Sequence, residues 1–302
     1  MSNFAIFHIL NLEEQSPKIQ GETKMATFYN QATLSYGNTV TTSNITVGEL
    51  ISGLTITKTA ASVGYGPGEG ITYVVSLVNG TSTDQTGITL TDDLGAYTVG
   101  TTTVVPLTYV NGSVLYYQNG ILQPTPGVTA GTNLEITGIT VPAGGNATIV
   151  YEATANSFAP IATGGSITNT ATVNDTEASA TVDVRTEASL TISKAICPAV
   201  VSDNGQLTYT FVIQNNGNLA ADAADNVTVS DTFNPILNDI AVTLDGSALA
   251  PTTGYTYNEA TGEFATVPGV ITVPAATYIQ DAETCAVNVT PGFAALVVSG
   301  TV

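Results

Sequence analysis

The segment ITYVVSLVN at residues 71–79 has the alternation of apolar and polar side chains that is typical of a half-buried β-strand. A closely similar segment, LTYTFVIQN, occupies residues 207–215. Two further pairs keep nearly the same spacing: GLTITKTA (53–60) matches ASLTISKA (188–195), and GITLTDDL (87–94) matches NVTVSDTF (226–233). The chain therefore contains an internal repeat, and we predict two homologous domains that begin near Leu54 and Leu190.

Both repeats consist of short alternating runs that are separated by turn signals. Asn-Gly or Asp-Gly pairs, which favour tight hairpin turns, begin at Asn111, Asn119, Asn216 and Asp245. No amphipathic helix pattern of useful length accompanies them. We therefore predict an all-β chain with two tandem immunoglobulin-like β-sandwich domains, preceded by an N-terminal strand or hairpin. A β-barrel is the alternative fold.

The repeat divides the chain into four predicted parts. These are a leader at 1–25, an N-terminal strand with a short linker at 26–52, sandwich domain 1 at 53–187 and sandwich domain 2 at 188–302. The leader lacks a basic start and a small-residue cleavage site, so we do not expect it to be a secretory signal. No segment has the length and apolar character of a membrane span, and we expect no membrane insertion.

Composition excludes several classes of function. Among 302 residues, 24 are acidic and 5 are Lys or Arg, which gives a formal net charge of −19. A nucleic-acid binder needs a basic face for the phosphates, so we expect no nucleic-acid partner. The single histidine is His8 and there are only two cysteines, too few good ligands for a zinc site or for a histidine-based catalytic site. We expect no metal, no cofactor and no enzymatic turnover.

The N-terminal segment has the sequence of a closing strand. Domain 1 ends with ITNTATVNDTEASATVDVRTEASL (167–190), but no such stretch follows NVTPGFAALVVSGTV (288–302) in domain 2. Residues 28–58 instead align with residues 167–194, which contain this closing stretch. The aligned pairs are Asn30 with Asn169, Ala32 with Ala171, Thr33 with Thr172, and Leu34 with Val173. We predict that domain 2 lacks its closing strand and that residues 26–50 carry a copy of it.

A sandwich without a closing strand has an open edge that another chain can pair with. We expect the N-terminal strand of one subunit to fill domain 2 of the next, with Asn30, Ala32, Leu34 and Tyr36 as its donor residues. Donor and acceptor would lie at opposite ends of a rod, and such a head-to-tail contact produces an open filament. Two alternatives are that the strand folds back onto its own domain 2 and that the C-terminus is truncated.

Motifs in both repeats resemble a known family. They read LTITK at 54–58, ITY at 71–73 with Asn79, TLTD at 89–92 and NTATV at 169–173. Together they resemble the conserved-repeat domain of bacterial surface proteins, the domain of unknown function eleven, here in a donor-strand-exchange arrangement. The resemblance covers residues 28–302 and implies an extracellular β-sandwich protein of a cell or spore surface. Its expected partners are further copies of the same chain.

Two lysines occupy equivalent positions in the repeats. Lys58 has Asp92 and Asn169 as candidate partners within one subunit, and Lys194 would have Asp231 together with Asn30 of a neighbouring subunit. Such a set resembles the isopeptide sites of Gram-positive pilins and adhesins. Burial lowers the pKa of a lysine, and a buried carboxyl can then polarise an asparagine amide while the neutral amine attacks it. The alternative is a plain Lys–Asp ion pair.

Two further features leave alternatives open. Cys197 and Cys285 both lie in domain 2, where an intradomain disulfide, a cross-subunit disulfide or two free thiols are possible. The adjacent residues Tyr116 and Tyr117 are the candidate aromatic platform for a second function, that of a monomeric adhesin or carbohydrate-binding rod. Paired tyrosines in strands more often pack across the sheet. The leading prediction is a self-assembling extracellular filament subunit.

Overall fold

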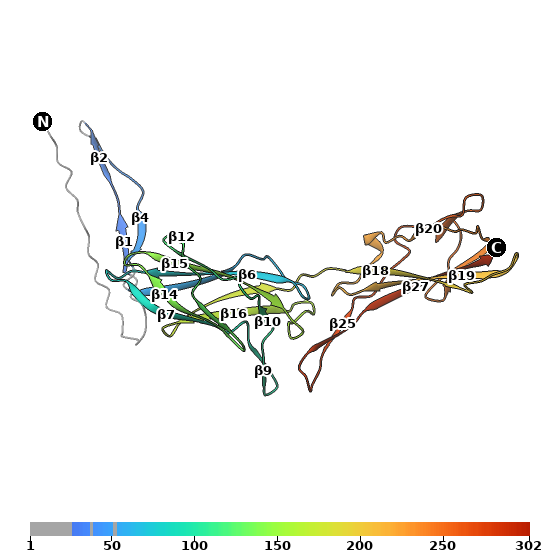
Figure 1. The fold of residues 1–302 in the computed structure, drawn as a ribbon. Coiled ribbons are helices and arrows are strands. Elements are labelled where there is room, and N and C mark those ends of the chain that lie inside the picture. The colour runs from blue at the N-terminus through green and yellow to red at the C-terminus, as the bar shows by residue number, and fades with distance from the viewer. Residues whose placement is uncertain (1–25, 37–38, 51–52) are drawn as a thin grey trace.

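The computed structural model describes residues 26–36, 39–50 and 53–302, and in this part of the chain the fold is almost entirely β (Figure 1). The one helical element described is a short 3-10 turn, η1 (Ala223–Asp225). Two β-sandwiches follow an N-terminal hairpin, as expected for an all-β, immunoglobulin-like chain, and this prediction is confirmed. Each sheet has two edge strands and does not close on itself, so the β-barrel alternative is wrong. The predicted leader, residues 1–25 with His8, lies outside the described residues.

Domain 1 has two packed sheets. The first has the order β12 (Ile121–Leu122), β11 (Leu115–Gln118), β15 (Asn146–Ala155), β6 (Gly70–Asn79), β5 (Leu54–Ala60), and β10 (Leu107–Tyr109) also pairs with β15. The second has the order β13 (Gly127–Ala130), β14 (Leu134–Val141), β7 (Gln85–Asp92), β16 (Ser166–Val173), β17 (Thr176–Asp183). A small hairpin, β8 (Tyr97–Val99) with β9 (Thr102–Val104), projects beside them.

Strict alternation of burial explains why these segments form a sandwich. In β6 the side chains of Ile71, Tyr73, Val75 and Leu77 are fully buried, while the residues between them are only partly covered. The strand β15, which pairs with β6, alternates in the same way. Successive side chains of a strand point to opposite faces, so each sheet contributes one apolar face to a common core.

Domain 2 repeats the first sheet of domain 1 but only part of the second. Its larger sheet has the order β18 (Leu190–Cys197), β19 (Gln206–Asn215), β27 (Gly292–Thr301), β21 (Asn238–Leu244), β22 (Ser247–Ala248). Its smaller sheet has the order β20 (Ser230–Thr232), β24 (Glu263–Thr266), β23 (Tyr255–Asn258). Within the described residues, no strand of domain 2 takes the place that β16 and β17 have in domain 1. The strand β20 therefore has one free edge.

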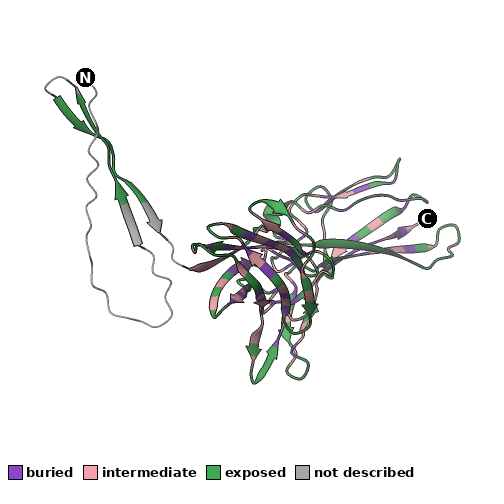
Figure 2. Cartoon of the chain, turned by 60° about the vertical axis from the view of Figure 1, so that its left-hand side comes forward, coloured by how far each residue is buried: buried purple, intermediate pink, exposed green. Residues whose placement is uncertain are grey.

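The N-terminal hairpin stands apart from both sandwiches. Its strands are β1 (Ala26–Asn30), β2 (Thr33–Tyr36), β3 (Thr39–Thr42) and β4 (Thr46–Leu50), and β1 pairs with β4 while β2 pairs with β3. The hairpin extends from the end of domain 1 that is opposite to domain 2 (Figures 1 and 2). In this structure it does not fold back onto its own domain 2.

The junction of the two domains is braced by a hairpin of domain 2. This hairpin, β25 (Thr277–Gln280) with β26 (Val287–Thr290), reaches back to domain 1, where the Val287 N–H donates to the Ser157 carbonyl at 2.8 Å. Tyr278 and Val287 pack against the core of domain 1. The Asn218 amide of domain 2 also donates to the carbonyls of Ile161 and Arg185 in domain 1. We call β25 and β26 the brace hairpin.

A glycine makes the close approach at this junction possible. Gly217 lies against the segment that connects β17 to β18, and a Cβ atom at this position would come within 2.2 Å of the Glu187 carbonyl oxygen. Any larger residue would force the connecting segment away from domain 2. The backbone contact therefore requires glycine.

Candidate functional site

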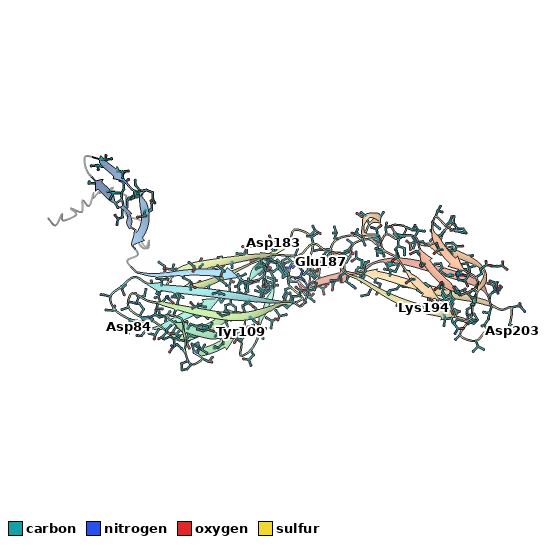
Figure 3. The ribbon with its side chains drawn as sticks, turned by 90° about the horizontal axis from the view of Figure 1, so that it is seen from above. Asp84, Tyr109, Asp183, Glu187, Lys194 and Asp203 are labelled. Atoms are coloured by element: carbon teal, nitrogen blue, oxygen red, sulfur yellow. The ribbon has the colours of Figure 1, made fainter. Side chains whose placement is uncertain are left out.

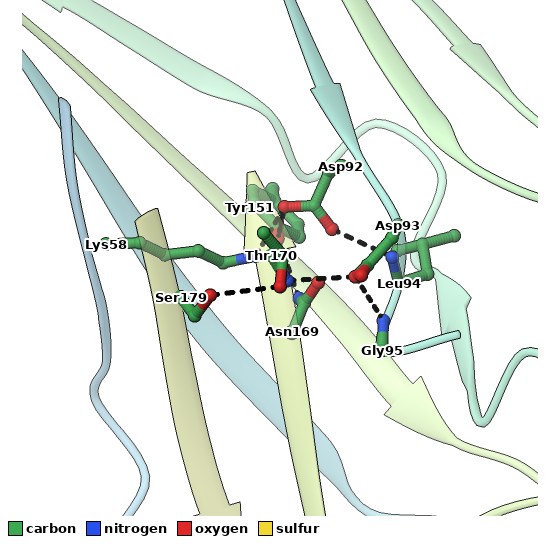
Figure 4. A network of polar contacts seen from close by, with 9 residues as sticks. All are labelled: Lys58, Asp92, Asp93, Leu94, Gly95, Tyr151, Asn169, Thr170 and Ser179. Carbon is green, nitrogen blue, oxygen red and sulfur yellow. Dashed lines mark hydrogen bonds and ion pairs between the residues drawn. The ribbon is translucent and has the colours of Figure 1, made fainter. Parts of the chain in front are cut away.

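A buried ion pair joins the first strand of domain 1 to the opposite sheet. Lys58 on β5 places its Nζ atom 2.5 Å from Oδ2 of Asp92 at the end of β7, and both side chains are fully buried (Figure 4). The second carboxylate oxygen of Asp92 accepts a hydrogen bond from the Leu94 N–H at 3.1 Å. The pair lies inside the sandwich because the inward alternation of β5 and β7 brings both residues into the core.

Asn169 belongs to the same buried cluster. It lies on β16, its side chain is 0% exposed, and its Nδ2 donates to the Tyr151 hydroxyl at 3.0 Å. That hydroxyl in turn donates to Oδ2 of Asp92 at 2.6 Å. Tyr151 thus links the two partners predicted for Lys58. The remaining amide oxygen, Oδ1 of Asn169, is buried and has no hydrogen-bond partner among the described residues.

Two stacked tyrosines surround the amine. The rings of Tyr73 and Tyr151 lie 5.5 Å apart, and Nζ of Lys58 is 4.9 Å from the centre of the Tyr73 ring. Aromatic faces attract a cation but also exclude water from it. The amine therefore lies in a dry site.

The dry site shifts both members of the pair toward their neutral forms. Burial lowers the pKa of Lys58, although the Asp92 carboxylate opposes the shift. Burial likewise raises the pKa of Asp92, against the opposing effect of Lys58. Both directions favour transfer of the shared proton from nitrogen to oxygen, which would leave a neutral amine beside a neutral carboxylic acid. A neutral amine is a nucleophile, and a carboxylic acid can polarise an amide carbonyl.

The equivalent pair of domain 2 lies in a different environment. Lys194, labelled in Figure 3, lies on β18. It is also paired with the carboxylate of Asp231, but 41% of its side chain is exposed. Its Nζ lies 4.3 Å from the centre of the Tyr209 ring. Tyr209 faces Val298 on the neighbouring strand, where domain 1 has Tyr151 opposite Tyr73. The rings of Phe211 and Phe233 lie within 6 Å of the same amine. Domain 2 therefore has the amine, the acid and an aromatic surrounding, but neither the bridging hydroxyl nor, within its own strands, an asparagine at this site.

The first strand of domain 2 is uncovered along its whole length. Every residue of β18 is exposed, with 57% exposure at Ile192 and 46% at Ile196. The equivalent strand of domain 1, β5, lies beside β17, and its Ile56 packs against the core. The same apolar pattern is thus covered in one domain and open in the other. Together with the free edge of β20 and the Lys194–Asp231 pair, we call this surface the open face of domain 2.

The predicted donor residues lie on the isolated hairpin. Asn30, Ala32 and Leu34 are exposed, and Leu34 is 60% accessible to solvent. The backbone of Tyr36 ends β2, but its side chain lies outside the described residues. Exposed Tyr29 and Val47 pair across the hairpin on its other face. Large apolar side chains on an unsupported hairpin are typical of a segment that binds elsewhere.

The structure corrects two alternatives. Tyr116 is 5% exposed and its hydroxyl donates to the Thr140 carbonyl, so the adjacent tyrosines form no exposed aromatic platform. Cys197 and Cys285 are free thiols. Cys197 lies at the end of β18 that is distant from domain 1, whereas Cys285 is in the turn of the brace hairpin. An intradomain disulfide is therefore wrong for this fold, because the two residues lie at opposite ends of domain 2. A cross-subunit bond stays a prediction.

The described part of the chain has neither a candidate metal site nor a candidate membrane helix. It contains no group of three or more His, Cys, Asp or Glu residues placed to hold a metal ion. It also contains no helix with the length and apolar character needed to cross a membrane.

Sequence reasoning missed Tyr151 and Tyr73. Tyr73 has an equivalent in Tyr209, so the repeat itself was a usable signal for it. Tyr151 has none, since Val298 stands at its place, and its role becomes visible only when β15 is placed opposite β6.

Comparison with known proteins gives the following results. A scan against protein-family models and a search of curated protein sequences found no match. Among solved structures, BcpA, the major pilin subunit of Bacillus cereus, is 14% identical with a TM-score of 0.33, over 80% of this chain and 66% of that one. The Streptococcus pneumoniae pilus backbone RrgB is 11% identical with a TM-score of 0.32, over 80% and 55%. The C-terminal domain of Streptococcus pyogenes AspA is 13% identical with a TM-score of 0.29, over 82% and 91%. At such values these similarities carry no functional argument.

Proposed function

We propose that the chain is the structural subunit of an extracellular filament, in which residues 26–50 of one subunit complete domain 2 of the next. The observation that supports this most directly is the contrast between Ile56, packed on its core, and Ile192, which is 57% exposed at the equivalent position. An apolar side chain contributes about 1.5–3 kcal/mol when it is fully buried. Covering β18 and inserting Leu34 would therefore contribute several kcal/mol to each contact between subunits.

The positions of donor and acceptor favour a chain over a closed ring. The hairpin leaves domain 1 at the end opposite to domain 2 (Figure 1). Each subunit would thus offer its hairpin at one end and its open face at the other. Repetition of one such heterologous contact without closure gives a linear polymer. The partners in this proposal are further copies of the same chain.

The Lys58 cluster would add a covalent bond inside each subunit. In this step the neutral Lys58 Nζ attacks the side-chain carbonyl carbon of Asn169, while the protonated Asp92 polarises the carbonyl oxygen. The new C–N bond forms as the Asn169 Nδ2 leaves as ammonia, and protons pass through Asp92 so that the acid is regenerated. The product is one amide bond and one ammonia, with no oxidation or reduction. Lys194, Asp231 and the Asn30 of a neighbouring subunit would undergo the same reaction between subunits.

The formation of the Lys58–Asn169 bond should depend on pH with a maximum. The reactive pair holds one proton in total, on Asp92. At low pH the Lys58 amine is also protonated and cannot attack; at high pH Asp92 loses its proton and no longer polarises the amide. Burial lowers the pKa of Lys58, so the rise of the rate at low pH should occur below the ordinary pKa of a lysine. Burial raises the pKa of Asp92, so the fall of the rate at high pH should occur above the ordinary pKa of an aspartate. Chain that has been made and kept unfolded in denaturant, and therefore still has its full sequence mass, is refolded at a series of pH values. The rate at which the mass of one ammonia is lost, measured by intact mass spectrometry, gives the profile. A rate that is constant with pH would contradict this mechanism.

Filament formation can be tested with the whole chain and a synthetic hairpin. Purified protein imaged by negative-stain electron microscopy should show fibres. A peptide of residues 26–50, added before assembly, should occupy the open face of domain 2 and shorten the fibres as its concentration rises. A peptide with Ala32→Arg is the matched control, because a buried arginine should prevent its binding. Protein that stays monomeric at high concentration would instead favour the alternative of a monomeric surface rod.

A further inference from the structure

We propose that the open face of domain 2 accepts the whole N-terminal hairpin, both of its strands, in one register that places Ala32 opposite Asp231 and Thr33 opposite Ser230. This inference rests on the strand donation proposed above and specifies the contact that would carry it out. The argument uses the closing hairpin of domain 1, formed by β16 and β17, as the internal template.

The first strand of the template defines the register. In domain 1, Ala171 pairs with Asp92 and Thr172 pairs with Thr91. Ala32 and Thr33 stand at the positions of Ala171 and Thr172 in the aligned sequences. Asp231 and Ser230 stand at the positions of Asp92 and Thr91, and they belong to β20, which pairs only with β24. The free edge of β20 therefore offers the pairing that β7 offers to β16.

The facing of the side chains excludes a slip by one residue. Along β16, the inward side chains are Ile167, Asn169, Ala171 and Val173, all of which are buried. The aligned positions of the hairpin are Phe28, Asn30, Ala32 and Leu34. A slip by one residue would exchange this set for Tyr29, Gln31 and Thr33, because successive side chains of a strand face opposite sides.

A polar contact excludes a slip by two residues. Such a slip keeps the same face inward but moves Asn30 away from the Lys194–Asp231 pair, and an apolar residue would take its place. The paired charges would then lose their amide partner, while the amide would be buried elsewhere without one. Unpartnered buried polar groups cost about 1–3 kcal/mol each. Asn30, the one polar residue among the four inward positions of the donated strand, therefore selects one register.

The second strand of the hairpin would cover β18. In domain 1, β17 lies beside β5 and buries Ala180 and Val182. These two residues pair with Asn169 and Ile167. In the N-terminal hairpin, the partners of Asn30 and Phe28 are Thr46 and Gly48. The strand β4 would thus pass over Ile192 and Lys194 as β17 passes over Ile56 and Lys58. A single donated strand would leave Ile192 and Lys194 exposed.

Mixed disulfides test the register across two subunits. Subunits with Thr33→Cys are unfolded together with subunits that carry Ser230→Cys, both in a Cys197→Ser, Cys285→Ser background, and are then refolded, assembled and oxidised. Directly opposite residues of antiparallel strands have Cα atoms about 4.5–5.5 Å apart, within reach of a disulfide. We expect a disulfide between residues 33 and 230, identified by peptide mass spectrometry. The matched control replaces Thr33→Cys by Ser35→Cys, which meets residue 230 only after a slip by two.

The outcomes separate the register from the filament itself. Fibres in which residue 35, or neither residue, is linked to residue 230 overturn the register but leave strand donation standing. Absence of fibres from the unmodified chain counts against the proposed function and the register together. Hydroxyl-radical footprinting of the unmodified fibres tests the second strand independently of any cysteine. Ile192 should lose most of its labelling on assembly, and unchanged labelling would overturn the two-stranded contact.

Discussion

Subunits without residues 26–50 are expected to stay monomeric at concentrations at which the complete chain forms fibres. The deletion removes every donor residue, whereas the residues that form the core of domain 1 or pack against it all lie after residue 53. Domain 1 should therefore keep its fold. Analytical ultracentrifugation measures the loss of assembly, and circular dichroism reports the retained β structure. Fibres of normal length from the deleted chain would contradict strand donation.

A pair of point variants makes the same test without shortening the chain. Ala32→Arg places a long charged side chain at a position whose template, Ala171, is 0% exposed. Burial of an unpaired charge costs several kcal/mol, so assembly should fall by orders of magnitude. Gln31→Arg adds the same charge at the adjacent position, which faces away from the proposed contact, and should assemble nearly normally. Equal assembly of the two variants would contradict the proposed facing of the strand.

Denatured subunits are expected to weigh less than their sequence by the mass of one ammonia for the internal Lys58–Asn169 bond. The bond would close a loop on the order of 100 residues, and a cross-link of that span stabilises a protein by about 4–5 kcal/mol in the loop-entropy model. Asn169→Ala should therefore restore the sequence mass and lower the free energy of unfolding by at least that order. Intact mass spectrometry and denaturant unfolding measure the two effects.

The adjacent position supplies the control for this prediction. Thr168 lies next to Asn169 on β16 but faces outward, where its hydroxyl contacts that of Thr181. Thr168→Ala should keep the loss of one ammonia and nearly all of the stability. An unmodified chain whose denatured mass equals its sequence mass would show that Lys58 and Asp92 form only an ion pair.

Much of this architecture could be predicted because the same strand patterns occur twice in the sequence. The alternation in residues 71–79 and 207–215 specifies two strands with buried apolar faces, β6 and β19, and the structure has both. Lys58, Asp92 and Asn169 were found from matched positions, and burial of all three follows from strand alternation.

Other features depend on distances that no local pattern encodes. Tyr151 and Asp92 are far apart in the chain. They meet only because β15 and β7 belong to the two sheets that face each other across the core of domain 1. The two cysteines of domain 2 looked like a pair in the sequence, but strand β18 and the brace hairpin carry them to opposite ends. Tyr116 looked like a surface residue, whereas its strand turns the ring inward to the Thr140 carbonyl.

The brace hairpin has a mechanical consequence for a fibre. It occupies the connection that leads into β27, and the same connection in domain 1, from β14 to β15, is a tight turn closed by the Gly145 N–H on the Pro142 carbonyl. Domain 1 thus has no counterpart of the brace hairpin that could contact the preceding subunit. Bending under load would concentrate at the joints between subunits, while each subunit acts as a stiff segment. The proposed polymer would yield to shear by flexing at regular intervals, and its persistence length would be governed by the joints between subunits.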